Sequence, residues 1–175
     1  SDVLDLEPDP LAAEEKMAIA IDRVQDPALI PQDKKWTVEI YKALAQEYIE
    51  ILQNRNAIRA LELTVSKFPF DRDAPVMVSR TAELYDQLSR IAPQGSETRN
   101  EYARKALDAR TALAKYVGTT PWTNANRGDA EALAQAEDLV KGGLRRAAAD
   151  HTNYARAYKE RAFQLSDAAQ QRAEL

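Results

Sequence analysis

The sequence predicts an all-α protein whose helices pair as antiparallel hairpins. Of its 175 residues, 45% are hydrophobic and 30% are charged, while glycine (5) and proline (8) are scarce, a composition typical of helical proteins. Apolar residues recur at steps of three and four along nearly every segment, which is the period of an amphipathic helix. The breaks between these segments are short, so consecutive helices are expected to lie antiparallel.

Residues 1–33 are predicted to form an acidic N-terminal helix and linker, ahead of a helical domain over 34–175. Asp9 is a suitable N-cap for a helix over 10–24, and two prolines mark the linker that follows. This segment carries nine acidic residues against two basic ones. Such a charge run is typically a solvated face, and an acidic docking tail is the alternative.

Two helical hairpins are predicted in the middle of the chain. Their helices span residues 34–54, 57–68, 74–91 and 97–117. Arg55 and Asn56 mark a turn of two or three residues in the first hairpin, and Pro69 ends its second helix. Asp73 and Ser96 are suitable N-caps for the two helices of the second hairpin.

The segment "GTTPWTNANRGD", residues 118–129, is predicted to be a joint between helices. Gly118 can end one helix and Asp129 can cap the next. An exposed Arg-Gly-Asp tripeptide could also serve adhesion, but the turn and cap explain the same residues. Trp122 is expected to fold back over the adjoining helix ends, and the alternative is an exposed anchor for a partner.

The last segment is predicted to hold a third helix pair after residue 129. Residues 150–153 could form its turn or lie inside one long helix. Gly142 and Gly143 interrupt a helical pattern at a cost of roughly 1 kcal/mol each. We therefore expect either a close helix contact or a bend at that point.

The residue inventory favours a non-enzymatic protein. There is no cysteine and no glycine-rich phosphate loop, and the single histidine, His151, cannot supply a zinc site. We expect no cofactor or metal. The net charge of −4 argues against nucleic acid as the main partner, and no run approaches the length of a membrane span. The first ten residues also lack the profile of a signal peptide.

The first hairpin resembles the tetratricopeptide repeat family. The pattern is carried by seven residues at the family's spacing: Tyr41, Leu44, Ala45, Tyr48, Ala57, Leu61 and Pro69. The small residues Ala45 and Ala57 are expected where the two helices cross. The second unit keeps Ala82 and Tyr85 at the same offset, and the third matches in general character. The resemblance implies hairpins stacked as an α-solenoid.

The segment from residue 118 to 157 also looks like part of large tetratricopeptide proteins of gliding bacteria, some linked to envelope and motility machinery. This resemblance favours the periplasm or cell envelope over the cytoplasm.

The family resemblance implies a groove that binds other proteins or peptide segments. The groove-facing positions would be Glu39, Lys42, Gln46, Glu50, Ser79, Arg80, Glu83 and Gln87. The family's clamp for terminal carboxylates uses Lys and Asn, and here Lys42 fits but Gln46 replaces the Asn. The leading interpretation is an interaction scaffold within a larger assembly. The alternative is a structural spacer or self-associating segment, which would form a homo-oligomer.

Overall fold

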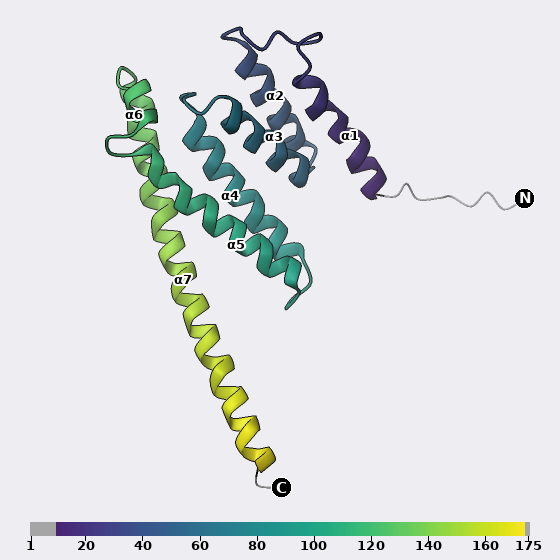
Figure 1. The fold of residues 1–175 in the computed structure, drawn as a ribbon, viewed down its shortest axis with the longest axis vertical. Coiled ribbons are helices and arrows are strands. Elements are labelled where there is room, and N and C mark those ends of the chain that lie inside the picture. Colours follow the sequence, from purple (N-terminus) through teal and green to yellow (C-terminus); the bar gives the residue numbers. More distant parts are fainter. Residues whose placement is uncertain (1–9, 174–175) are drawn as a thin grey trace, which may run out of the picture.

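The structure, a computed structural model, describes residues 10–173, and this part of the chain is helical without strands. The elements are α1 (Pro10–Val24), α2 (Thr37–Glu50), α3 (Asn54–Lys67), α4 (Ala74–Ile91), α5 (Glu97–Ala112), the 3₁₀ helix η1 (Leu113–Tyr116), α6 (Pro121–Ala125) and α7 (Ala130–Ala173). Consecutive helices from α2 to α5 pack against one another, and α7 crosses α5 (Figure 1). The predicted all-α class is confirmed.

The α2–α3 hairpin forms because each helix buries one stripe. Tyr41, Ala45 and Tyr48 follow one face of α2 and are almost fully buried, and Ala57 and Leu61 do the same on α3. The two alanines belong to the same buried cluster, as expected for small residues near a helix crossing. The stripe predicted from the sequence is therefore the stripe that packs.

The turn of this hairpin lies slightly earlier than predicted. Residues 51–53 connect the helices, whereas Arg55 and Asn56 are already inside α3. Leu52 takes a left-handed conformation with φ 61°, which lets the chain reverse in three residues but is rare for a side chain of this kind. Asn56 is buried and donates to the carbonyl of Glu14 at 3.0 Å.

Helix α1 packs on the α2–α3 hairpin. Ile21 and Val24 are buried, and the hydroxyl of Tyr48 donates to the carbonyl of Met17. The helix inside the acidic N-terminal segment therefore shares a core with the helices that follow. Asp9, its expected N-cap, lies outside the described residues.

The second hairpin, α4–α5, was predicted with two side-chain caps. Ser96 does cap α5, because its Oγ accepts from the backbone nitrogen of Arg99 at 3.1 Å. Asp73 occupies the N-cap position of α4 without making a cap hydrogen bond. The expected cap is wrong, because the backbone of Asp73 (φ −92°, ψ 5°) lacks the extended conformation of a capping residue; its carboxylate binds Lys42 at 2.8 Å.

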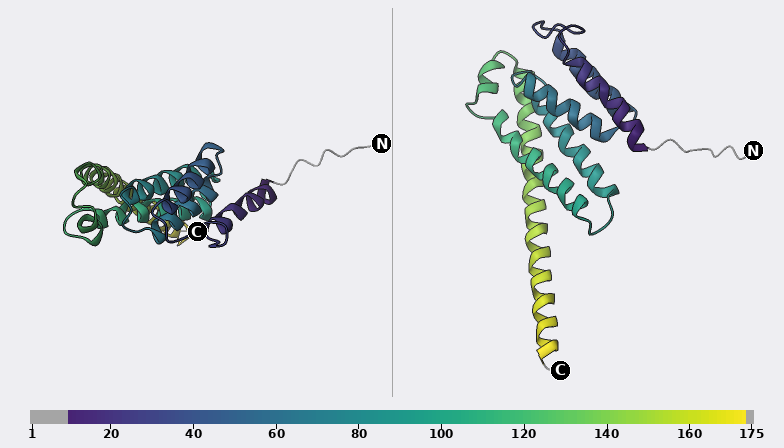
Figure 2. Two further views of the ribbon diagram at one scale, coloured as in Figure 1. Left: turned by 90° about the horizontal axis from the view of Figure 1, so that it is seen from above. Right: turned by 45° about the vertical axis from the view of Figure 1, so that its right-hand side comes forward.

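The expected third pair is replaced by one helix. Helix α7 has 44 residues without a break, which corresponds to about 66 Å. Residues 150–153 lie inside it, and His151 is exposed on its surface instead of marking a helix end. The first part of α7 packs on the body through Ala132, Ala136 and Val140, and the helix then continues beyond the other helices (Figure 2).

The sequence predicted either a close helix contact or a bend at Gly142 and Gly143. The structure shows a close contact at Gly143. A Cβ on Gly143 would lie 2.6 Å from Leu113 Cδ1, whereas a Cβ on Gly142 would meet nothing within 4 Å. Gly143 therefore lets α7 approach η1 closely.

None of the helices in the described residues is both long enough and apolar enough to cross a membrane.

Candidate functional site

The eight predicted groove residues lie along α2 and α4. They are Glu39, Lys42, Gln46 and Glu50 on α2, and Ser79, Arg80, Glu83 and Gln87 on α4. Four of them, the three Glu residues and Gln46, are exposed, and the other four are half-buried. Two pairs bond along their own helix: Gln46 with Glu50 at 3.0 Å and Arg80 with Glu83 at 2.7 Å. We call this surface the α2/α4 face.

Lys42 is not a free groove residue. Its side chain is 18% exposed, and its ammonium lies 2.8 Å from both Asp71 and Asp73 and 3.1 Å from Glu39. Burial alone would lower the pKa of Lys42, but hydrogen bonds to these three carboxylates outweigh burial and raise it. Lys42 therefore ties α2 to the loop before α4. Gln87 is also used internally, because its Oε1 accepts from Asn54 at 3.2 Å.

The loop at residues 70–73, which directly precedes α4, contacts three segments that are distant in the sequence, and we call it the 70–73 junction. The indole nitrogen of Trp122 donates to the carbonyl of Asp71 at 2.8 Å, and the amide of Asn126 donates to that of Phe70 at 3.1 Å. Arg72 reaches the start of α7, with its guanidinium 3.4 Å from Asp129 and 3.1 Å from Glu131. Helices α2, α4, α6 and α7 thus meet at one loop.

Trp122 is a packed residue, as the sequence predicted. It is 3% exposed, and its ring lies edge-on to Tyr116 with centroids 5.4 Å apart. A buried indole requires an acceptor for its N–H, which the carbonyl of Asp71 supplies. The segment from residue 118 to 129 is therefore a joint, and its tryptophan fastens it to the 70–73 junction.

The Arg-Gly-Asp tripeptide serves the same joint. Asp129 accepts from the backbone nitrogen of Ala132 at 3.0 Å and so caps α7 as predicted. Its second carboxylate oxygen pairs with Arg72. Because both oxygens are engaged within the fold, the structural role accounts for this aspartate. Arg127 and Gly128 lie at the surface.

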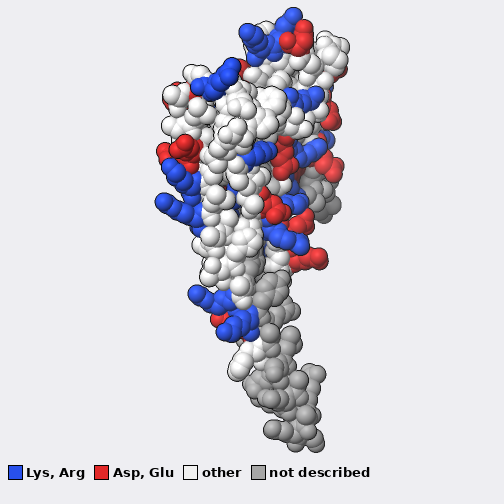
Figure 3. All heavy atoms as spheres, turned by 60° about the vertical axis from the view of Figure 1, so that its left-hand side comes forward, with Lys and Arg blue, Asp and Glu red and all other residues white. Residues whose placement is uncertain are grey.

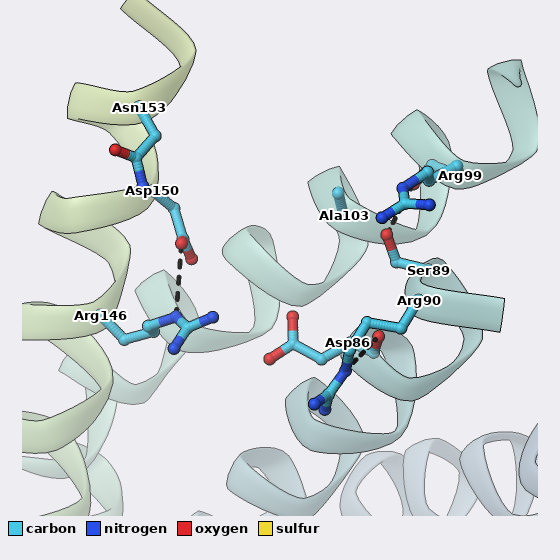
Figure 4. A pocket seen from close by; sticks show the side chains of 8 residues that line it. All are labelled: Asp86, Ser89, Arg90, Arg99, Ala103, Arg146, Asp150 and Asn153. Atoms are coloured by element: carbon cyan, nitrogen blue, oxygen red, sulfur yellow. Dashed lines mark hydrogen bonds and ion pairs between the residues drawn. The ribbon is translucent and has the colours of Figure 1, made fainter. Parts of the chain in front are cut away.

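A cleft of about 630 Å³ opens between α4, α5 and α7, and we call it the arginine cleft. Its walls are formed by Asp86, Ser89, Arg90, Arg99, Ala103, Arg146, Asp150 and Asn153. Figure 4 shows Arg146, Asp150 and Asn153 on α7 facing Asp86, Ser89 and Arg90 on α4 across the opening. None of the eight predicted groove residues lines it, and its volume is in the range of ligand sites.

A buried arginine that does not line the cleft binds two aspartates of its walls. Arg110 on α5 is 7% exposed. Its guanidinium binds Asp86 of α4 and lies 3.1 Å from Asp150 of α7. A buried charge is stable only when it is paired, so Arg110 and its two carboxylates fix the three helices that form the cleft. Arg146 adds a second contact to Asp150 at 3.3 Å.

Two further arginines in the walls bond to backbone oxygens. The Nε of Arg90 donates to the carbonyl of Asp86 at 3.3 Å, and the guanidinium of Arg99 donates to the carbonyl of Ala92 at 3.5 Å. The hydroxyl of Ser89 on α4 donates to the backbone carbonyl of Arg99 and so links α4 to the start of α5. Within residues 10–173, neither of these guanidinium groups forms an ion pair with a carboxylate. The walls thus hold three arginines and two aspartates, and both aspartates also bind Arg110.

Sequence reasoning missed this cleft, although a signal for it exists. Arg110 follows Leu107 by three residues and precedes Leu113 by three, so it occupies a position on the apolar stripe of its helix. A charged residue on such a stripe requires a carboxylate partner from another element. The partners themselves come from positions 24 and 40 residues away, and no local pattern identifies them.

Comparisons with protein-family models, with curated proteins and with solved structures give no match for this chain. The tetratricopeptide resemblance accordingly rests on the spacing of the residues in the first two hairpins.

Proposed function

We propose that this protein is a non-enzymatic interaction scaffold of tetratricopeptide-like build, and that the α2/α4 face binds a polar segment of a partner protein. The observation that carries the proposal is that this face is polar, open and held on a fixed frame. Gln46, Glu50 and Glu83 are exposed, while the buried stripes beneath them pack α2 and α4 into one core. A face that is already ordered loses little entropy when it binds.

The charges on this face favour a partner segment that is itself of mixed polarity. Arg80 and Glu83 form a pair 2.7 Å apart, and Glu39 stands beside Lys42. Exposed pairs of this kind add little to stability, but they set which partner charges are accepted. On the family resemblance, such a scaffold works within a larger assembly, and an envelope location follows from the same resemblance.

The proposal is tested at Arg80 and Glu83, because Lys42 also supports the fold. The double change Arg80→Glu and Glu83→Lys reverses the local charge order without altering the net charge. Proteins captured from a native extract should be lost by this variant, while circular dichroism and the melting temperature stay unchanged. A variant with Lys67→Glu, an exposed position outside the face, should retain them. Equal capture by all three proteins would contradict the proposal.

A second function, self-association through α7, is favoured by one specific observation. Every side chain of α7 described after residue 150 is exposed, and Phe163 is 74% exposed. A large apolar side chain on an unpacked helix is a suitable contact for another copy. Light scattering over a range of concentrations tests this function: a dimer that disappears on Phe163→Glu supports it, and a monomer at all concentrations contradicts it.

A further inference from the structure

We propose that the arginine cleft is a second binding site, separate from the α2/α4 face, and that it takes an acidic peptide segment of a partner protein. The walls come from α4, α5 and α7, whereas the α2/α4 face lies on α2 and on other residues of α4. The two sites have different residues and different charge requirements. This allows each to be tested without the other.

The first step of the argument is the charge of the cleft. Residues 34–175 carry 22 basic and 19 acidic residues, and the walls of the cleft hold three arginines and two aspartates. Arg110 binds both aspartates and Arg146 pairs with Asp150, so two cations balance the two carboxylates and Arg90 and Arg99 are the excess. The face shown in Figure 3 carries acidic and basic side chains interspersed over the helices. The cleft therefore carries a local excess of positive charge.

The second step is the bonding capacity of the outer arginines. Arg90 and Arg99 each have one hydrogen bond to a backbone carbonyl, and Arg146 contacts Asp150 through Nε. A guanidinium has five N–H donors, so each of the three retains donors for another oxygen. Carboxylates accept such donors in pairs and form charge-assisted hydrogen bonds with them. The cleft is thus equipped for anionic oxygens.

The third step is the spacing of these donors. Arg146 reaches into the cleft from α7, whereas Arg90 and Arg99 lie on the opposite side, at the end of α4 and the start of α5 (Figure 4). A cleft of about 630 Å³ has room for a ligand much larger than one small ion, because a water molecule occupies only about 30 Å³. Two or more carboxylates spaced along a peptide can reach both walls. Asn153 on the α7 wall adds an amide that can bond to the peptide backbone.

The probe is a fluorescein-labelled hexapeptide of alternating Asp and Glu, compared with the same peptide in Asn and Gln, with fluorescence anisotropy as the measurement. The full chain should bind the acidic peptide and leave the amide peptide free. The double change Arg90→Gln and Arg99→Gln should weaken binding about tenfold or more, because a hydrogen bond to a charged group is lost on one wall. Arg146→Gln should weaken it independently from the other wall.

The matched control is Arg104→Gln, which removes an exposed arginine of α5 that does not line the cleft. It should bind the acidic peptide as the unchanged chain does. Equal binding of the two peptides, or unchanged affinity in both cleft variants, would overturn the proposal. Displacement of the peptide by millimolar inorganic phosphate, at the ionic strength where chloride has no effect, would also overturn it and indicate a free-phosphate site.

Discussion

The 70–73 junction and the arginine cleft are both polar, and both join segments far apart in the sequence, but their charge balance is opposite. At the junction two cations, Lys42 and Arg72, are surrounded by carboxylates, and backbone carbonyls accept from Trp122 and Asn126. In the cleft, arginines outnumber carboxylates and the space between the helices is open. The comparison indicates that a polar region whose hydrogen-bond donors are all paired within the fold serves to join helices. A polar region with unpaired donors can bind a ligand as well.

The largest expected effect comes from breaking the charge pairing under the cleft. Arg110→Met leaves Asp86 and Asp150 without their shared cation in a partly buried place. We expect the free energy of unfolding to fall by about 3 to 5 kcal/mol, measured by urea denaturation. Adding Asp86→Asn and Asp150→Asn should restore part of the loss, since the unpaired charges disappear. A loss below about 1 kcal/mol for Arg110→Met would show that the three helices do not depend on this group.

The second largest effect is expected from a substitution that disrupts the 70–73 junction. Lys42→Met removes an ammonium that lies 2.8 Å from both Asp71 and Asp73. We expect a loss of about 2 kcal/mol, the size of hydrogen bonds to a charged group. The control Lys34→Met removes an exposed lysine paired with its neighbour Asp33 and should leave the urea midpoint unchanged. If Lys42→Met matches this control, Lys42 is not needed for the fold and stays a candidate groove residue, as the family resemblance implies.

A third prediction sharpens the role of α7, which contributes to both regions. Gly142→Ala should raise stability by about 1 kcal/mol, because alanine favours the helix and the new Cβ meets nothing. Gly143→Ala should lower stability by about 1 kcal/mol, since its Cβ would overlap the buried side chain of Leu113. Thermal melting of the two variants gives the comparison. Equal shifts in both would mean that α7 and η1 separate easily.

The smallest expected effect concerns Tyr116, which packs against Trp122 next to the junction. The hydroxyl of Tyr116 is buried next to Trp122, and no partner for it is found within the described residues. Burial raises the pKa of Tyr116 to about 12, so the phenol is neutral at ordinary pH. Tyr116→Phe should raise the free energy of unfolding by roughly 1 kcal/mol, because an unsatisfied polar group is removed. A loss of stability would reveal a partner for this hydroxyl.

The helices could be predicted from the sequence because the residues that define a helix and its ends lie close together in the chain. The buried stripe of α2 is visible as apolar residues three and four positions apart, namely Tyr41, Ala45 and Tyr48. The caps at Ser96 and Asp129 each bond to a backbone nitrogen three residues further on. The continuity of α7 could also have been resolved, because residues 150–153 contain neither glycine nor proline to stop a helix.

The contacts that decide the two polar regions could not be predicted in this way. Asp73 has a cap position available, and the structure shows its carboxylate on Lys42, 31 residues away in the sequence. Asp86 and Asp150 look like ordinary surface residues until α5 brings Arg110 between them. Such choices depend on the relative placement of helices, which propensity and periodicity do not specify.

The close approach at Gly143 attaches α7 to the body of the protein about a third of the way along its length. Helix α7 rests on η1 at this point, and its last 23 residues, after Asp150, extend for about 35 Å. The buried side chain of Ala147 and the pairing of Asp150 with Arg110 attach α7 beyond this point as well. The part of α7 after Asp150 therefore extends from a base that is attached at several points, so a partner bound to that part would be held in a fixed direction from the body.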